Sequence, residues 1–387
     1  MNRFVSDRSS RNQQPRIAFL TPALGGGIGR VLINLSNAFT QRGVPVDLLL
    51  GKPESSYLQQ LSPQVRVLHL PTTHSLSGLP ALVGYLRRER PAVINTDSIR
   101  VNVLALRARS LAQITSRQPL RVCATLHNTY SRALATRSSA KRRSQLSRLR
   151  RYYPRNDAVI AVSRGVADDF LELAPLSPSR LHVIPNPVVT PGIEHMAALD
   201  AGHPWLEPGQ PPLLLAVGRL HPQKDYPTLL RACAALPRSI AWRLLILGEG
   251  EQRHYLEQLI GELDLTGRAA LGGQVDNPYA YMARARLLVL SSAWEGFGNV
   301  LVEAMAVGTP VVATDCPHGP GEILDKGRLG RLVPVGDAVA LAAAISDVLA
   351  QPAPASEVLR AATEPYRVAT VAEQYARLLL PHERPAS

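Results

Sequence analysis

Cysteine is scarce in this chain of 387 residues, which contains three. Cys123, Cys233 and Cys316 are scattered, odd in number and without the spacing of metal ligands. This pattern excludes a disulfide framework and favours a protein of the reducing cytoplasm. We expect the three thiols to be small buried side chains.

Long apolar runs are also missing. No stretch approaches the roughly 18 uninterrupted apolar residues that a membrane-spanning helix requires. Residues 1–16 are polar and do not predict a secretory signal, and residues 1–14, with few apolar side chains, are expected to be disordered. Because 45% of the residues are hydrophobic and the chain is long, the sequence predicts a globular protein of two domains.

Acidic side chains are in deficit, with 30 Asp and Glu against 43 Lys and Arg, so the net charge is +13. Nucleic acid, an anionic membrane and nucleotide phosphates can each attract such a chain. The sequence contains none of the standard nucleic-acid-binding modules, and we expect no nucleic-acid partner.

The basic residues gather in segment 137–155, which holds eight Lys and Arg and no acid. Leu146, Leu149, Tyr152 and Tyr153 give the expected helix one weakly apolar side. We expect it to rest on anionic headgroups of the inner face of the cytoplasmic membrane, at roughly 1 kcal/mol per basic residue. An ordinary solvated basic helix is the alternative. The expected membrane contacts are Lys141, Arg142, Arg143, Arg148, Arg150 and Arg151.

Short apolar runs alternate with helical patterns along most of the chain, which predicts parallel, doubly wound α/β sheets. The poorly periodic, proline-rich residues 190–212 are typical of a linker. Helices are expected at 31–39, 78–89, 226–235, 338–349 and 369–380. Strands are expected at 17–20, 46–50, 65–68, 92–95, 121–126, 158–162, 213–220, 243–247, 287–290, 311–313 and 330–334.

Residues 287–315 form the most informative stretch. A buried strand at 287–290 leads into a glycine-rich loop at 295–298, after which Asn299 can cap a helix that Gly308 ends. Such a loop offers unpaired N–H groups and a positive dipole end to an anion. Glu295 and Glu303 lie on either side of this helix start, seven residues apart.

This stretch, EGFGxxLxEAMAxGTPVV, resembles the retaining nucleotide-sugar glycosyltransferases of family 4. The segment GRLHPQKDYPTLL is similar to their GRLxxxKGxxxL, and VIPNPV to their interdomain hinge. The resemblance implies the α/β GT-B fold, in which two Rossmann-like domains with parallel sheets face each other across a cleft. It places an acceptor-side domain at 15–190, a nucleotide-sugar domain at 191–368 and a helix that crosses back within 369–387.

The resemblance also implies roles for charged residues. Glu303 would hold the ribose, since a carboxylate can accept hydrogen bonds from both hydroxyls, and Glu295 would contact the donor sugar. Arg219 and Lys224, just before a helix, would stabilise the departing diphosphate, for which a forked guanidinium and an ammonium are suited.

The remaining donor contacts come from loops. Gly26 and Gly27 match the glycine pair that faces the donor in relatives, which usually carry an acid where this chain has Gly29. His127, at a strand end, is either a catalytic neighbour of the donor sugar or a structural histidine. Gln274 and Val275 would lie beside the base, and the donor loop would add Gly296, Phe297, Gly298 and Asn299.

The resemblance implies an enzyme of class EC 2.4, a hexosyltransferase for polysaccharide or lipopolysaccharide synthesis. Its donor would be a UDP-sugar in preference to a GDP-sugar, and its acceptor a hydroxyl of a lipid-linked or cell-surface glycan. Because Asp-x-Asp is absent from the sequence, we expect neither a metal nor another cofactor. Two alternatives remain: a nucleotide-sugar 2-epimerase of the same fold, and a non-catalytic basic peripheral membrane protein.

Overall fold

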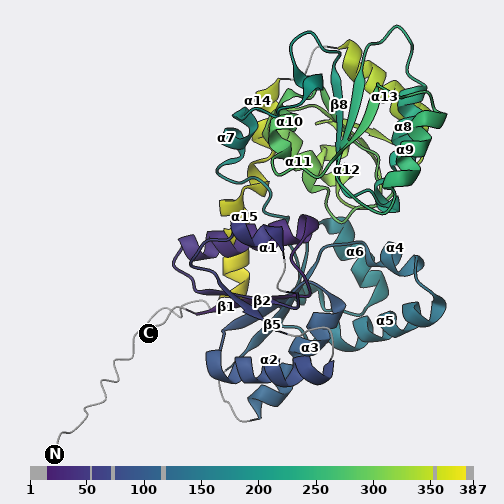
Figure 1. The fold of residues 1–387 in the computed structure, drawn as a ribbon. Helices are drawn as coiled ribbons and strands as arrows, with labels where there is room; N and C mark the ends of the chain where they lie inside the picture. Colours follow the sequence, from purple (N-terminus) through teal and green to yellow (C-terminus); the bar gives the residue numbers. More distant parts are fainter. Residues whose placement is uncertain (1–14, 53–54, 71–74, 115–118, 352–354, 381–387) are drawn as a thin grey trace, which may run out of the picture.

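The computed structural model describes residues 15–380 except 53–54, 71–74, 115–118 and 352–354, and it shows two α/β domains (Figure 1). The predicted disorder of residues 1–14 lies outside the described residues, as do residues 381–387. Each domain is built around one parallel sheet, so the predicted fold class is confirmed.

The first domain has a seven-stranded sheet in the order β3-β2-β1-β4-β5-β6-β7. Successive residues of its strands face opposite sides: Ile17 and Phe19 belong to one apolar cluster, whereas Ala18 and Leu20 belong to another. The strands are β1 (Ile17–Thr21), β2 (Val46–Leu50), β3 (Arg66–His69), β4 (Val93–Thr96), β5 (Arg121–Leu126), β6 (Ala158–Ala161) and β7 (Leu181–Val183).

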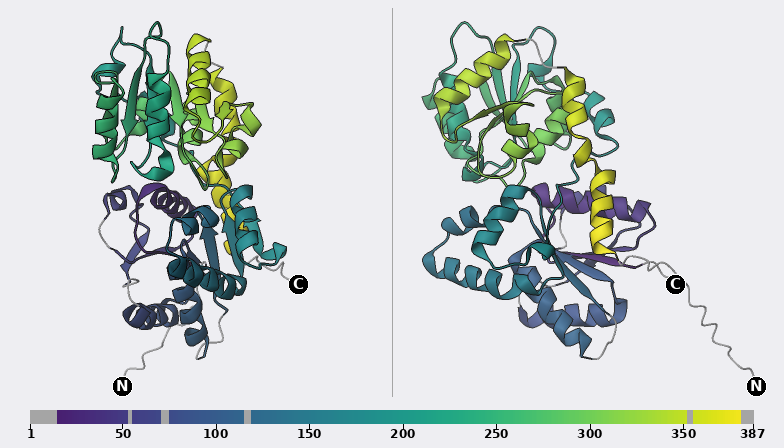
Figure 2. Two further views of the ribbon diagram at one scale, coloured as in Figure 1. Left: turned by 90° about the vertical axis from the view of Figure 1, so that its right-hand side faces the viewer. Right: turned by 180° about the vertical axis from the view of Figure 1, so that it is seen from behind.

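Helices cover both faces of this sheet (Figures 1 and 2). The first and last helices of the chain, α1 (Gly26–Gln41) and α15 (Val368–Leu379), pack on one face. On the other face lie α2 (Ser75–Glu89) and α3 (Ile99–Gln113). The remaining helices of the domain are α4 (Tyr130–Ala135), α5 (Ser139–Tyr152) and α6 (Arg164–Leu173).

The second domain has a six-stranded sheet in the order β10-β9-β8-β11-β12-β13. Its strands are β8 (Leu213–Val217), β9 (Arg243–Leu247), β10 (Ala269–Gly273), β11 (Leu287–Leu290), β12 (Val311–Thr314) and β13 (Arg331–Val333). One face is covered by α8 (Tyr226–Ala234), α9 (Arg253–Glu262) and α13 (Ala338–Ala350). The other elements are α7 (Ile193–Ala198), α10 (Pro278–Arg284), α11 (Asn299–Ala306), α12 (Pro320–Ile323) and α14 (Ser356–Ala362).

The chain passes between the domains twice, and the two crossings lie side by side. The amides of Val188 and Val189 donate to the carbonyl of Tyr366 at 2.9 and 3.0 Å, and the amide of Val368 donates to the carbonyl of Val189 at 3.0 Å. Beyond the second crossing, α15 buries Tyr375 against the first sheet, where Figure 1 shows it in yellow beside α1.

Three local expectations differ from the structure. Residues 190–212 include the helix α7, which is fixed to the second domain by hydrogen bonds from Asn277 and Arg284 to its carbonyl groups. Strand β10 at Ala269–Gly273 was not predicted as a strand. Helix α3 was not predicted, because arginine and asparagine interrupt its apolar positions.

Two observations bear on the residue types that are scarce. Cys123, Cys233 and Cys316 are free and buried, as predicted. Across the described ranges, no helix combines the length and apolar character that crossing a bilayer demands.

Candidate functional site

A cleft of about 830 Å³ lies between the domains, at the carboxyl ends of strands from both sheets. The first domain contributes the loop after β1 and the end of β5, and the second contributes the loops after β8, β9, β10 and β11. Ligands of open α/β sheets bind at this edge because the loops there converge and the helix N-termini point inward.

The structure brings every residue of the predicted donor site, together with His127, to the wall of this cleft. They are Gly26, Gly27, His127, Arg219, Lys224, Gln274, Val275, Glu295, Gly296, Phe297, Gly298, Asn299 and Glu303. The predicted membrane-contact residues do not line it. They lie on α5, at the far side of the first domain (Figure 1).

Lys224 and Glu295 form a closely spaced ion pair in the cleft. Lys224 Nζ lies 2.6 Å from Glu295 Oε1, and the hydroxyl of Ser292 donates to the same oxygen at 2.6 Å. Their side chains are only 16% and 9% exposed, so water screens the pair weakly. Each group therefore holds the other in place, and a ligand meets both charges together.

Arg219 contrasts with this pair. It follows β8, is exposed, and has no ion-pair or hydrogen-bond partner among the described residues. Its guanidinium can therefore bind an anion at the cleft without first leaving a protein partner.

Glu303 lies on α11, is 5% exposed, and faces Arg30 from the first domain. Burial raises the pKa of Glu303, and the positive charge of Arg30 opposes that shift. Arg30 Nη1 lies 3.8 Å from Glu303 Oε1 and donates to the Tyr279 hydroxyl at 2.5 Å. Burial alone would lower the pKa of Arg30. The neighbouring Glu303 and Tyr279 raise it by more than burial lowers it, so this guanidinium remains charged.

The loop of Glu295 and Gly296 touches the first domain. The hydroxyl of Thr129 donates to the Glu295 carbonyl at 2.6 Å, and that of Ser163 to the Gly296 carbonyl at 2.8 Å. A Cβ atom on Gly296 would lie 2.0 Å from the carbonyl oxygen of His127. Glycine is required here because the two backbones meet at van der Waals contact.

His127 presents an unpaired ring nitrogen at this contact. Its Nε2 is buried and has no hydrogen-bond partner in the described part of the chain. Burial lowers the pKa of His127 to about 4, so the imidazole is neutral at pH 7. A neutral ring can donate or accept one hydrogen bond from a bound ligand.

Sequence reasoning was wrong about Asn299 as a helix cap. Gly298, with φ +101°, precedes the helix, and Asn299 is its first residue. Its Oδ1 accepts a hydrogen bond from Asn186 Nδ2 at 2.8 Å, which ties the interdomain hinge to the donor loop.

Arg30, Tyr279 and Asn186 were missed as functional residues. Arg30 directly follows the glycine-rich loop, and Asn186 lies within the hinge motif, so both carried a positional signal. Tyr279 carried none, because its contact with Arg30 joins residues 249 positions apart. Within the described ranges, no three side chains among His, Cys, Asp and Glu are grouped as a metal site would require.

Two family models match successive parts of the chain. Residues 25–190 match "Glycosyltransferase Family 4" and residues 203–364 match "Glycosyl transferases group 1". The two ranges meet near the first interdomain crossing.

Relatives cover the chain to different extents. The lipopolysaccharide core biosynthesis glycosyltransferase LpsE of Rhizobium meliloti is 28% identical over 330 residues, which are 84% of this chain and 86% of LpsE. A Campylobacter jejuni N-acetylgalactosamine-N,N'-diacetylbacillosaminyl-diphospho-undecaprenol 4-alpha-N-acetylgalactosaminyltransferase is 34% identical over 183 residues, which are 47% of this chain and 48% of that enzyme.

A solved structure shares the whole fold. Anabaena HepE, crystallised with UDP and glucose, superposes with a TM-score of 0.77 over 95% of this chain and 99% of HepE, at 22% sequence identity. The family matches and the glycosyltransferase relatives favour an enzyme over the non-catalytic alternative. The chain is a glycosyltransferase with the GT-B fold, a transferase of class EC 2.4.

Proposed function

We propose that the enzyme is a retaining, metal-independent hexosyltransferase that uses a UDP-sugar and glycosylates a hydroxyl of a lipid-linked or cell-surface glycan. HepE holds UDP and glucose, which supports a uridine donor. The relatives named above are assigned to the lipopolysaccharide core and to a diphospho-undecaprenol acceptor, which supports a lipid-linked glycan.

The observation that carries this proposal is the arrangement of charges in the cleft. Arg219 is exposed and has no acidic partner among the described residues, and Lys224 is paired with Glu295. Glu303 lies on α11, one helix turn after Asn299. A nucleotide-sugar offers matching groups in one molecule: a diphosphate for the cations, sugar hydroxyls for Glu295 and ribose hydroxyls for Glu303.

The proposed chemistry uses these groups without a covalent enzyme intermediate. The bond between the anomeric carbon and the diphosphate oxygen breaks, and Arg219 and Lys224 stabilise the negative charge that develops. The acceptor hydroxyl attacks the oxocarbenium-like sugar from the same face, and its proton passes to the departing phosphate oxygen. Glu295 positions the sugar, and neutral His127 offers one further hydrogen bond beside it.

Domain closure would complete the site. Arg30 of the first domain reaches Glu303 and Tyr279 of the second, so contact between the domains places a positive charge beside this carboxylate. Closing the cleft would also exclude water from the oxocarbenium-like sugar.

A thermal-shift screen tests the donor assignment. Purified protein is heated with nucleoside diphosphates and their sugars in the presence of EDTA, and we expect selective stabilisation by one UDP-sugar. Glu303→Ala should abolish most of that shift, because it removes the acceptor of the two ribose hydrogen bonds, about a 100-fold loss of affinity. The exposed Glu207→Ala is the matched control.

The outcomes separate the hypotheses. Stabilisation that requires an added divalent cation contradicts metal independence, and stabilisation by a GDP-sugar contradicts the uridine donor. The 2-epimerase alternative predicts that the donor alone is converted to its epimer. The transferase predicts no epimer and a product with unchanged anomeric configuration once a glycan acceptor is added, which NMR of the product establishes.

We also propose that α5 holds the enzyme at the inner face of the cytoplasmic membrane. All six predicted contacts on this helix are exposed, whereas Leu149 and Tyr152 on its apolar side are buried against the domain. This arrangement supports attraction by charge, without insertion of the helix into the acyl layer.

A further inference from the structure

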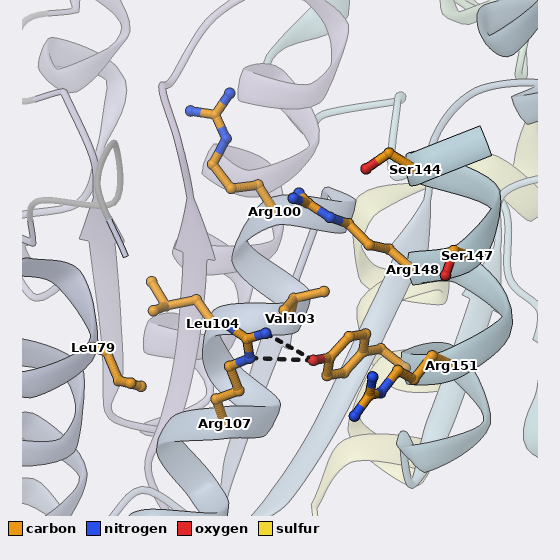
Figure 3. Close-up of a pocket in the computed structure, with 10 residues that line it drawn as sticks. Leu79, Arg100, Val103, Leu104, Arg107, Ser144, Ser147, Arg148 and Arg151 are labelled. Carbon is orange, nitrogen blue, oxygen red and sulfur yellow. Dashed lines mark hydrogen bonds between the residues drawn. The ribbon is translucent and has the colours of Figure 1, made fainter. Parts of the chain in front are cut away.

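A second cavity, of about 450 Å³, lies between α3 and α5 in the first domain (Figure 3). Two matching helix stripes form it. Helix α3 contributes Arg100, Val103, Leu104 and Arg107, and α5 contributes Ser144, Ser147, Arg148 and Arg151, each set at spacing i, i+3, i+4, i+7. Leu79 of α2 and Tyr152 complete the lining. We call this cavity the arginine pocket.

Two helices that face each other with this spacing usually fill the space between them with apolar side chains. Here four arginines occupy the facing positions, and the lining contains no acid. Neither α3 nor α5 contains any Asp or Glu. Nothing in these two helices therefore neutralises the positive charge that they bring together.

The four arginines also lack acidic partners elsewhere in the described part of the chain. By contrast Arg109, two residues beyond Arg107 on α3, is paired with Asp157 at 2.7 Å. In Figure 3 the side chain of Arg148 extends from α5 toward Arg100 on α3. Positive charges that line one cavity without a counter-charge repel one another, and an anion bound there would relieve that repulsion.

Three arginines surround the side chain of Tyr152 at the pocket. Its hydroxyl accepts hydrogen bonds from Arg107 Nε and Nη2 at 3.2 and 2.9 Å, which Figure 3 shows as dashed lines. The Cζ atoms of Arg107, Arg151 and Arg155 lie over its ring, 5.4 to 5.7 Å from the ring centre. These arginines lower the pKa of Tyr152, the hydrogen bonds from Arg107 most of all.

The rest of the lining narrows the chemistry of the occupant. Guanidinium groups bind phosphate oxygens in pairs, and the hydroxyls of Ser144 and Ser147 can donate to further oxygens. Val103, Leu104 and Leu79 give the pocket an apolar border. A phosphate group attached to an apolar chain meets both parts of this lining.

We propose that the arginine pocket binds the phosphate group of a membrane lipid. The exposed basic residues of α5 continue outward from the pocket, so a headgroup bound there would lie beside the surface that faces the membrane. This inference rests on the proposed membrane contact of α5 and is independent of the donor assigned to the cleft.

The test compares two pairs of variants with equal loss of charge. Arg100→Gln with Arg148→Gln changes the pocket, and Arg142→Gln with Arg143→Gln changes exposed positions of α5 outside it. Binding of the full-length protein is measured by flotation with vesicles of phosphatidylcholine plus either phosphatidic acid or oleic acid, adjusted to the same zeta potential. Stabilisation by the UDP-sugar reports whether each variant keeps its cleft.

We expect the pocket pair to bind phosphatidic acid vesicles about tenfold more weakly than the control pair does, and both pairs to bind oleic acid vesicles equally. Equal losses on both vesicles would overturn the proposal, because diffuse attraction would then explain all binding. A thermal shift with inorganic pyrophosphate that only the pocket pair loses, without any preference for phosphatidic acid, would also overturn it in favour of a soluble phosphate. Failure of the wild type to bind any anionic vesicle would refute the membrane contact itself and leave the donor site untouched.

Discussion

The cleft and the arginine pocket both contain several cations, but they differ in whether those cations have acidic partners. In the cleft, Lys224 and Arg30 each face a carboxylate, Glu295 and Glu303 respectively. In the arginine pocket, four arginines line the cavity together with hydroxyls and apolar side chains, and no carboxylate is among them.

Burial explains the difference. Lys224 and Arg30 are largely withdrawn from water and need counter-charges of their own, whereas the pocket arginines, like Arg219 in the cleft, are exposed and do not. A site with built-in pairs suits a ligand that presents hydroxyls and phosphates together. A site of unpaired cations suits an anion alone.

The largest expected effect comes from comparing the two cations inside the cleft. Replacement of either Lys224 or Arg219 by Ala should lower kcat about 10²- to 10³-fold, because each removes charge stabilisation from the departing diphosphate. Only Lys224→Ala should lower the free energy of unfolding, by about 3 kcal/mol, since it leaves the buried Glu295 without a counter-charge. Urea unfolding and steady-state kinetics measure the two effects.

Removing Glu295 as well provides the control, and Lys224→Ala with Glu295→Ala should regain most of the lost stability. If Arg219→Ala destabilised the protein as much as Lys224→Ala does, Arg219 would be a structural cation and the contrast within the cleft would fail. If it left kcat unchanged, its assigned role at the diphosphate would be wrong.

A substitution at the contact between the domains should impair catalysis in the cleft and leave vesicle binding at the arginine pocket unchanged. Gly296→Ala places a Cβ atom against the His127 carbonyl and should force the domains apart, with about a 100-fold loss of kcat. Vesicle binding through α5 and the arginine pocket should not change. Gly261→Ala, on an open helix surface, is the matched control and should be neutral. A Gly296→Ala enzyme with normal kcat would show that the contact is dispensable.

The smallest expected effect is a difference in pH dependence. As pH falls from 6.5 toward 4, the unfolded chain protonates His127 while the folded protein does not, so stability decreases. His127→Asn should remove about 2 kcal/mol of the loss between pH 7 and pH 5. The exposed His254→Asn should not. Binding to phosphatidylglycerol vesicles, whose phosphodiester stays ionised in this range, should stay constant, because arginines remain charged.

A measured loss that is the same in wild type and His127→Asn would mean that the ring is hydrated or already paired in the folded protein. Vesicle binding that changed over the same range would show that titrating groups, rather than arginines, govern the membrane contact.

The sequence predicts the fold well because the strands are buried on both sides and read as continuous apolar runs. Val311 and Val312 show this: they face opposite apolar clusters, and a single run of valines specifies both. The gathering of the donor loops also follows from the sequence, since loops at the carboxyl ends of parallel strands share one edge.

Contacts between the domains were beyond sequence reasoning. The distance from Arg30 to Glu303 depends on how two separately folded sheets face each other, and no local pattern encodes that. Asn299 was misjudged for a related reason. An asparagine at a helix start favours capping, but its hydrogen bond to Asn186, 113 positions away, outweighs the local preference.

The paired crossings at Val188–Val189 and Tyr366–Val368 have a mechanical consequence. A single flexible connection would let the second domain rotate about any axis relative to the first. Two neighbouring connections, joined by three backbone hydrogen bonds, favour rotation of the domains about a single axis. Rotation about that axis would bring Arg30 back to Glu303 each time the cleft closes.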